Sequence, residues 1–336
     1  MKRIAAASVV VIATGMGAVA DDGFFRGKTI TIINSTGNGG SYFNIAQSVS
    51  RYMPKYIDGA PAMIVKSMPG AGNVLATNFM YNAAPKDGTH IATINNSIPL
   101  HQVINGRGVQ YDATKFNWLG STGTYNSVAY VWHTAGVRSI KDLDTKEVLV
   151  GGTGPGSSIV IYPAAMNKLL GSKFKFVLGY KSTHEIDMAM ERGEVEARTG
   201  SYTGLRSDHP DWISQKKVDI ILQIGSKRDA DLPNVPLLHE LARSEADREV
   251  LKLISSPISL GRPYLAPPGV PEVRLATLRK AFMATLRDPG FLEEAKKLDH
   301  EIDPQTAEEV AQIVSGTINA PKAAIAIAKQ IMGGVE

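Results

Sequence analysis

Hydrophobic and polar positions along this chain switch repeatedly between the pattern of a strand and the spacing of a helix. Residues 28–34 (KTITIIN) form a β-branched run that predicts a strand, and this run leads into a loop of glycines and hydroxyls. Over residues 42–53 the apolar positions recur at helical spacing, and Pro54 predicts the end of that helix. The first unit is therefore a strand, a glycine-rich loop and a helix.

The same alternation continues through the first two thirds of the chain. Pro163 is expected near the first turn of its helix, where a missing N–H is tolerated. Ser139 and Asp142 predict a short capped helix. Such alternation predicts parallel sheets covered by helices. Further strands are predicted at residues 62–67, 90–95, 127–133, 147–150, 174–179, 195–199 and 218–224, and further helices at residues 74–83, 159–170 and 182–192.

The last part of the chain has a different pattern, a strand followed only by helices. The strand is predicted within residues 256–266, before a proline-rich run at 267–271. A strand and helices after a complete α/β block predict that the chain returns to the first lobe. The helices are predicted at residues 272–287, 291–298, 306–320 and 322–332.

These elements predict an α/β fold of two lobes, each a mostly parallel sheet flanked by helices. We expect two crossover segments to join the lobes, near residues 120–127 and 253–260. Lobe 1 would then comprise residues 21–125 and 254–336, and lobe 2 residues 126–253.

The first twenty residues predict a secretory signal peptide. Lys2 and Arg3 precede an apolar run at residues 4–13, and residues 18–20 (AVA) offer a small-x-small cleavage site. The run is shorter than the ~20 residues that span a bilayer. An N-terminal membrane anchor is the alternative. Cleavage after Ala20 would leave 316 residues in a bacterial periplasm.

Composition narrows the chemistry that this chain can perform. The sequence has no cysteine, so it forms neither disulfides nor thiolate metal sites. Without Lys2 and Arg3 the formal charge falls from +4 to +2, and no basic tract indicates a nucleic-acid partner. A chain of this length usually forms two domains. We expect a monomer that carries no cofactor or metal.

Two strand–loop–helix units carry the candidate chemistry, one in each expected lobe. Their loops, at residues 36–41 and 153–158, combine glycines with hydroxyls. Glycine lets successive backbone N–H groups converge on one point, and the following helix adds its own unpaired N–H groups. Two such loops facing each other across a cleft would bind carboxylate groups. A structural tight turn is the alternative explanation of Gly152, Gly154 and Gly156.

Three larger side chains are further candidates. Arg198 is expected near a strand end beside glycine and hydroxyls, a setting that suits bidentate carboxylate recognition. A salt bridge to Glu194 or Glu196 is the alternative. Tyr42 and Tyr202 could form walls of the cleft, although ordinary packing explains them equally well. Glu185, Asp187 and Glu191 are expected on a solvated helix face.

Known catalytic patterns are missing from the sequence. No lysine follows the glycine loops as a phosphate-binding P-loop requires, and neither loop has the dinucleotide-binding spacing. No G-x-S-x-G motif is present, and the seven histidines show no metal-ligand spacing. An exported hydrolase with Ser157 or Ser158 as nucleophile remains an alternative, without an identifiable base.

The order of several short motifs resembles the tripartite tricarboxylate transporter receptors, also called Bug-type solute-binding proteins. Residues 68–73 (MPGAGN) and 84–89 (APKDGT) are similar to the family's N-x-P-G-A-G-G … A-x-P-D-G-Y-T signature, with the second proline one place early and no Tyr after Gly88. Further similar motifs follow in family order across the mature chain: Gly39-Gly40, then 139–143 (SIKDL), 152–157 (GTGPGS), 193–196 (GEVE), 227–228 (KR), 232–236 (LPNVP) and 265–271 (LAPPGVP).

The resemblance implies a type II periplasmic-binding fold that closes on a small carboxylate and delivers it to a membrane permease. A ligand sensor for a membrane signalling partner is an alternative with the same binding step. Many relatives have an Asp after the first glycines, where this chain has residues 41–43 (SYF), which argues against an amino-acid ligand. The candidate ligand-binding residues are Thr36, Asn38, Gly39, Gly40, Ser41, Tyr42, Gly72, Asn96, Thr153, Gly154, Gly156, Ser157, Ser158, Arg198 and Tyr202.

Overall fold

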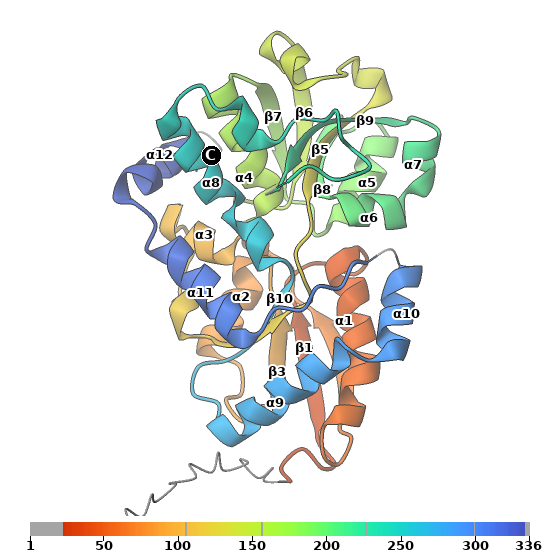
Figure 1. The fold of residues 1–336 in the computed structure, drawn as a ribbon, viewed down its shortest axis with the longest axis vertical. Helices are drawn as coiled ribbons and strands as arrows, with labels where there is room; N and C mark the ends of the chain where they lie inside the picture. The colour runs from red at the N-terminus through yellow and green to blue at the C-terminus, as the bar shows by residue number, and fades with distance from the viewer. Residues whose placement is uncertain (1–22, 105, 156, 226, 299, 333–336) are drawn as a thin grey trace, which may run out of the picture.

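The computed structural model describes residues 23–332 except residues 105, 156, 226 and 299. The predicted signal peptide, its cleavage site and Gly156 lie outside these described residues. Two lobes are stacked along the longest axis of the molecule (Figure 1). None of the helices in the described part of the chain has the length and apolarity needed to cross a bilayer.

Each lobe is built on a sheet flanked by helices, as the sequence predicted, and each sheet has five strands, of which Asn117–Ser121 in lobe 1 was not predicted. The sheet of lobe 1 has the order β2-β1-β3-β10-β4 and that of lobe 2 the order β7-β6-β8-β5-β9. The strands of lobe 1 are β1 (Thr29–Asn34), β2 (Ala62–Ser67), β3 (His90–Thr93), β4 (Asn117–Ser121) and β10 (Pro263–Ala266). Those of lobe 2 are β5 (Ser127–Trp132), β6 (Glu147–Gly152), β7 (Lys173–Leu178), β8 (Ala197–Ser201) and β9 (Val218–Ile224).

Both sheets are mixed, and in each a single strand runs against the other four. In lobe 1 that strand is β10, which is antiparallel to β3 and β4. In lobe 2 it is β5, which is antiparallel to β8 and β9. Each of these strands enters its lobe from a crossover and therefore runs away from the other lobe. The remaining strands consequently carry their carboxyl ends toward the interlobe gap.

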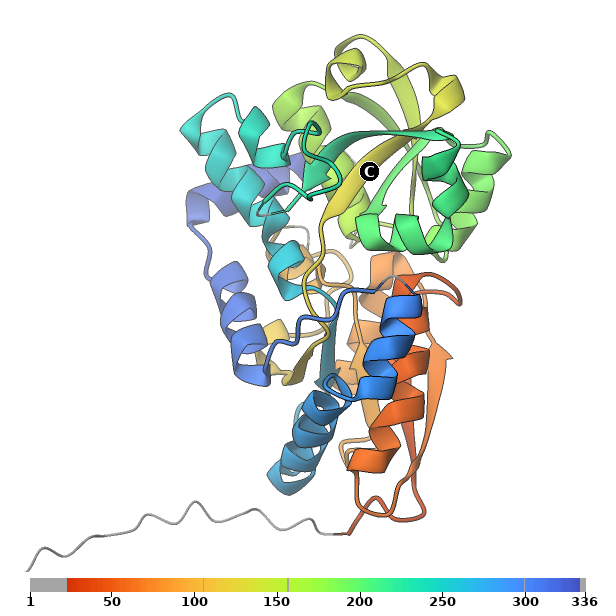
Figure 2. The ribbon, with the colours of Figure 1, turned by 45° about the vertical axis from the view of Figure 1, so that its right-hand side comes forward.

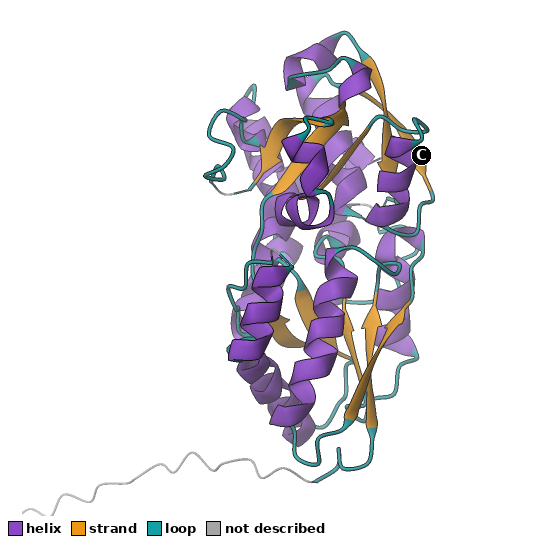
Figure 3. Cartoon of the chain, turned by 90° about the vertical axis from the view of Figure 1, so that its right-hand side faces the viewer, coloured by secondary structure: helices purple, strands orange, loops and turns teal. Residues whose placement is uncertain are grey.

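Helices cover both faces of each sheet, as Figure 3 shows. In β1, Ile30 and Ile32 pack with one set of helices, whereas Ile33 belongs to the core on the opposite face, as the two-residue period of a strand requires. The first face of the lobe 1 sheet carries α1 (Ser41–Tyr52), α9 (Glu272–Thr285) and α10 (Pro289–Lys297), and the second carries α2 (Val74–Asn82), α3 (Ile98–Ile104) and α11 (Ala307–Ile318).

Lobe 2 has the same layered arrangement. Its helices are α4 (Ser158–Ala165), α5 (Thr183–Glu191), α6 (Tyr202–Asp208), α7 (Pro210–Ser214) and α8 (Glu245–Leu260). The C-terminal helix α12 (Lys322–Met332) packs against α4 and α8, with Ala328 fully buried in the core that contains the β5 and β6 side chains. The predicted lobe boundaries stay a prediction; residues 253–260, near which the second crossover was expected, are the last residues of α8.

Pro163 lies inside α4 rather than near its first turn, so that expectation was wrong. A proline cannot donate the bond that the Ile159 carbonyl would accept from position 163. The Thr199 hydroxyl of β8 donates to this carbonyl instead, at 3.2 Å. A π-helical turn at Met166–Leu170 follows. A tertiary contact therefore replaces the missing helical bond.

Candidate functional site

Five helices begin at one pocket between the lobes. Parallel strands that end at the same edge bring the starts of the helices that follow them to that edge. The residues immediately before these helices, which line the pocket, are Gly40 (α1), Asn73 (α2), Ser157 (α4), Ser182 (α5) and Ser201 (α6). The pocket therefore receives helix N-termini from both lobes, each with a partial positive charge.

Two of these N-termini, those of α1 and α4, keep their first backbone N–H groups available, whereas in α2 the Val74 and Leu75 N–H groups donate to the Ala71 and Gly70 carbonyls. The side chains of Ser182 and Ser201 accept bonds from the first turns of α5 and α6. By contrast, α1, α2 and α4 have no side-chain cap. The first N–H groups of a helix have no partner within it. Lobe 1 and lobe 2 thus each present an uncapped helix start, α1 and α4, to the same space.

The pocket is neutral in its side chains but rich in hydroxyls and amides. No Asp, Glu, Lys, Arg or His is among the described residues that line it. Its cavity volume is about 60 Å³ in this arrangement of the lobes, so the enclosed space is small. Thr153 contributes a buried hydroxyl that has no hydrogen-bond partner within the described chain. Such a group is normally satisfied, so a polar ligand atom would complete it.

Both predicted glycine loops line this pocket, and eight of the predicted residues do so directly. These are Thr36, Gly39, Gly40, Ser41 and Tyr42 from lobe 1, and Thr153, Ser157 and Ser158 from lobe 2. The sequence reasoning missed the other lining residues, which are Asn73, Asn95, Tyr125, Ser127, Ile159, Ser182, Thr183, Gly200 and Ser201. Asn95 and Ser201 could have been found from the sequence, because they lie at or just after the ends of predicted strands.

Tyr42 connects the pocket wall to the crossover region. Its hydroxyl accepts a bond from the Asn96 backbone N–H and donates to the Gly261 carbonyl, both at 3.2 Å. Burial raises the pKa of Tyr42 well above its ordinary value, so the hydroxyl stays protonated. Asn96 lies behind this wall, where its amide donates to the Tyr125 hydroxyl at 3.1 Å and to the Pro257 carbonyl at 2.9 Å.

The lobes touch through backbone atoms at the rim of the pocket. The Gly37 N–H donates to the Lys181 carbonyl across the gap, at 3.1 Å. A Cβ placed on Gly154 would lie 2.8 Å from the backbone nitrogen of Gly72. The two predicted glycines therefore contact each other, and neither is among the lining residues. Figure 2 shows the two lobes one above the other.

Arg198 does not line the pocket. It is buried in lobe 2, where Nε and Nη2 donate to the two carboxylate oxygens of Asp187, at 2.5 and 3.0 Å. The alternative of a salt bridge is therefore confirmed, but with another partner, because Glu194 pairs with Arg192 and Glu196 accepts a bond from the Leu149 N–H. Asn38 is exposed outside the pocket, and Tyr202 is buried without lining it.

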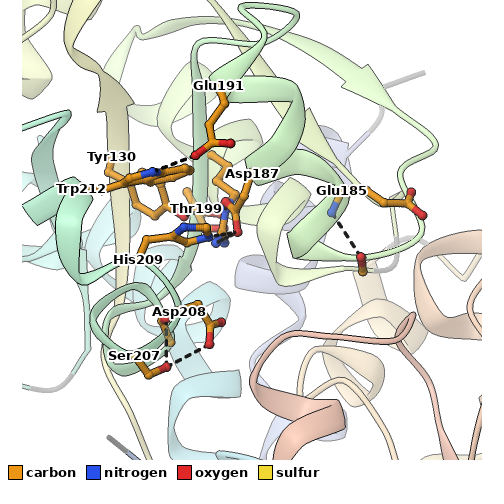
Figure 4. Close-up of polar contacts among 12 residues, drawn as sticks. Tyr130, Glu185, Asp187, Glu191, Thr199, Ser207, Asp208, His209 and Trp212 are labelled. Carbon is orange, nitrogen blue, oxygen red and sulfur yellow. Dashed lines mark hydrogen bonds and ion pairs between the residues drawn. The ribbon is translucent and has the colours of Figure 1, made fainter. Parts of the chain in front are cut away.

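Asp187 lies in the interior rather than on a solvated helix face, so that expectation was wrong. Figure 4 shows its carboxylate directed toward His209, whose Nε2 lies 3.0 Å away. The His209 ring stacks on Trp212, and the Arg198 guanidinium lies over the Tyr130 ring. Burial opposes ionisation of Asp187, but Arg198 and His209 outweigh it and lower its pKa. The ion pair is therefore a structural element of lobe 2.

Comparison with known proteins identifies the architecture. The model of the tripartite tricarboxylate transporter family receptor matches residues 45–329. A "UPF0065 protein in gbd 5'region" from Cupriavidus necator is 24% identical over 332 residues, which cover 96% of this chain and 94% of the relative.

Three solved structures share the fold at low sequence identity. The periplasmic binding protein BugD has a TM-score of 0.73 at 19% identity, covering 92% of this chain and 98% of its own. MatC from Rhodopseudomonas palustris with bound malate has a TM-score of 0.71 at 18% identity, covering 91% and 99%. Rpa4515 from R. palustris with adipate has a TM-score of 0.71 at 15% identity, covering 91% and 97%.

Replacing Asp187 with Asn should destabilise lobe 2, because the substitution leaves Arg198 buried without its partner. We expect the free energy of unfolding at pH 7 to fall by about 3–5 kcal/mol in a urea titration. Because the pKa of Asp187 is lowered on folding, the wild type has its full advantage in unfolding free energy at pH values above the ordinary carboxyl pKa of about 3.9. The advantage should disappear as the pH falls through the lower folded pKa.

The matched control is Glu194→Gln, which removes the exposed partner of Arg192. Its unfolding free energy should stay close to that of the wild type, because exposed ion pairs add little stability. Equal losses in the two variants would contradict the structural importance of the buried pair.

Proposed function

The chain belongs to the tripartite tricarboxylate transporter receptor family of non-enzymatic periplasmic solute-binding proteins, and we propose that it captures a small dicarboxylate between its lobes. The observation that carries the proposal is the pair of uncapped helix starts, α1 and α4, which open into one uncharged pocket from opposite lobes. Each would bind one carboxylate through backbone N–H groups, assisted by the hydroxyls of Ser41 and Ser158.

A dicarboxylate fits this arrangement because binding sites on two lobes can be occupied together only when the lobes close. Charge-assisted hydrogen bonds contribute about 1.5–3 kcal/mol each. Several of them would give a micromolar dissociation constant, about −8 kcal/mol, after the costs of ordering. The malate and adipate named for two structural relatives are small dicarboxylates and support this ligand class.

The role after capture is proposed as delivery to a tripartite transporter permease, after export directed by residues 1–20 and cleavage behind Ala20. Membership of a non-enzymatic receptor family removes the exported-hydrolase alternative. A ligand-sensing role differs only in the membrane partner. Co-purification from membranes of a permease subunit or of a signalling protein, with and without ligand, separates the two roles.

Thermal unfolding of the purified chain starting at Asp21 should reveal the ligand class. Malate, adipate and other small dicarboxylates are expected to raise the unfolding midpoint, because a ligand at 100 times its dissociation constant adds about 2.7 kcal/mol. Their dimethyl esters provide the control and should give no shift. A panel of dicarboxylates without effect at millimolar concentration would contradict the proposal.

Thr153→Val should weaken binding, since it removes the unpartnered hydroxyl in the pocket while keeping the shape of the side chain. We expect a roughly tenfold or greater loss of affinity in calorimetry, equivalent to about 1.5 kcal/mol or more. Thr145→Val, at an exposed position of the same lobe, is the matched control and should bind as the wild type does. Unchanged affinity in Thr153→Val would remove this hydroxyl from the site.

Gly154→Ala should impair closure, because its methyl group would collide with the Gly72 backbone. We expect at least tenfold weaker dicarboxylate binding, together with a ligand-induced decrease in the radius of gyration that is smaller than in the wild type. Gly179→Ala is the control: Gly179 also has a positive φ, but nothing lies within 4 Å of the added carbon. Similar losses in both variants would attribute the effect to backbone strain alone.

A further inference from the structure

Arg262 occupies the second crossover between the lobes, directly after α8 and before β10. Its side chain is only 1% exposed. The guanidinium lies 4.2 Å from the ring centre of Tyr125, in the first crossover, and 6.0 Å from that of Tyr42. Nη2 donates to the hydroxyls of Ser201 and Thr203 in lobe 2, at 3.2 and 3.4 Å. One side chain thus joins both crossovers, the pocket wall and lobe 2.

No carboxylate among the described residues forms an ion pair with Arg262, and its Nε has no hydrogen-bond partner there. The contrast with the equally buried Arg198 is direct, since Arg198 has both oxygens of Asp187. A buried charge without a counter-ion is costly. A guanidinium cannot remove that cost by losing its proton. An anion placed nearby is therefore the natural compensation.

The pocket provides an adjacent space for such an anion. Tyr42, Tyr125 and Ser201 contact the guanidinium and also line the pocket. Charges separated by side chains in a closed, water-poor cleft interact far more strongly than charges in water. When the lobes separate, the bonds to Ser201 and Thr203 would break, and water would reach the guanidinium.

We infer that Arg262 makes closure depend on the negative charge of the ligand. The inference rests on the proposed function, because the anion in question is the bound dicarboxylate. In the closed form the ligand compensates the buried guanidinium from behind the pocket wall. Without an anion, closing the lobes buries an uncompensated charge, and this disfavours the closed form. Arg262 is thus a specificity-determining positioning residue that selects dianions over monoanions and neutral analogues.

The test compares Arg262→Met and Arg262→Lys with wild type by calorimetry, using a dicarboxylate and its monomethyl ester. Arg262→Met should lose about tenfold or more in affinity for the dicarboxylate and much less for the monoester. Arg262→Lys, which keeps the charge, should retain most of the preference for the diacid. Arg138→Met, at an exposed position of lobe 2, is the matched control and should bind as wild type.

The unfolding midpoint without ligand gives an independent measurement. Arg262→Met should unfold at the same temperature as wild type or a higher one, because an apolar side chain replaces an uncompensated charge. A lower midpoint, or an equal loss of affinity for diacid and monoester, would assign Arg262 to packing and overturn the inference. Wild type that binds no dicarboxylate would contradict the proposed function instead, and the midpoint comparison would still test the charge of Arg262.

Discussion

The direction of the strands is the constraint on which this structure depends. Among the strands of the described residues, only β5 and β10, which enter their lobes from the crossovers, run away from the gap. The other strands point their carboxyl ends toward it. The helices that follow must then begin at the gap, with their unpaired N–H groups directed into it. The proposed site for an anion therefore arises from topology, without a charged side chain among the described lining residues.

Capture of a ligand between the lobes also requires that the lobes approach each other closely, and glycines allow this approach. Gly154 meets the backbone of Gly72, and Gly37 donates a backbone bond to the loop before α5. Side chains at these positions would hold the lobes apart. The glycines of the two predicted loops therefore have different tasks: Gly39 and Gly40 line the pocket, whereas Gly154 forms the contact that closes it.

Two buried arginines show how the same residue type serves different purposes. Arg198 is neutralised by Asp187 within lobe 2 and stabilises that lobe irrespective of any ligand. The Arg262 guanidinium, at the crossover, donates to hydroxyls and lies over an aromatic ring, and no carboxylate of the described chain pairs with it. A buried charge that is paired within the protein stabilises the fold. A buried charge that is unpaired keeps an electrostatic field that acts on a ligand in the adjacent pocket.

The sequence alone determined the local elements and the family. The predictions for β2, β9 and α12 match the observed residues, and Ser139 and Asp142 form the expected capping box, because strand and helix spacing and capping are read from neighbouring positions. Motif order was sufficient for the receptor family. Both glycine loops were found because glycines and hydroxyls after a strand are a local signal.

Only the tertiary structure decided which distant residues share an environment. It placed Tyr125, Thr183 and Gly200 in the pocket, Asp187 against Arg198, and Arg262 behind the pocket wall. It also allowed Pro163 inside a helix, through the Thr199 hydroxyl of another strand. These outcomes depend on contacts between segments far apart in the chain, and no pattern of neighbouring residues encodes which partner will fold against them.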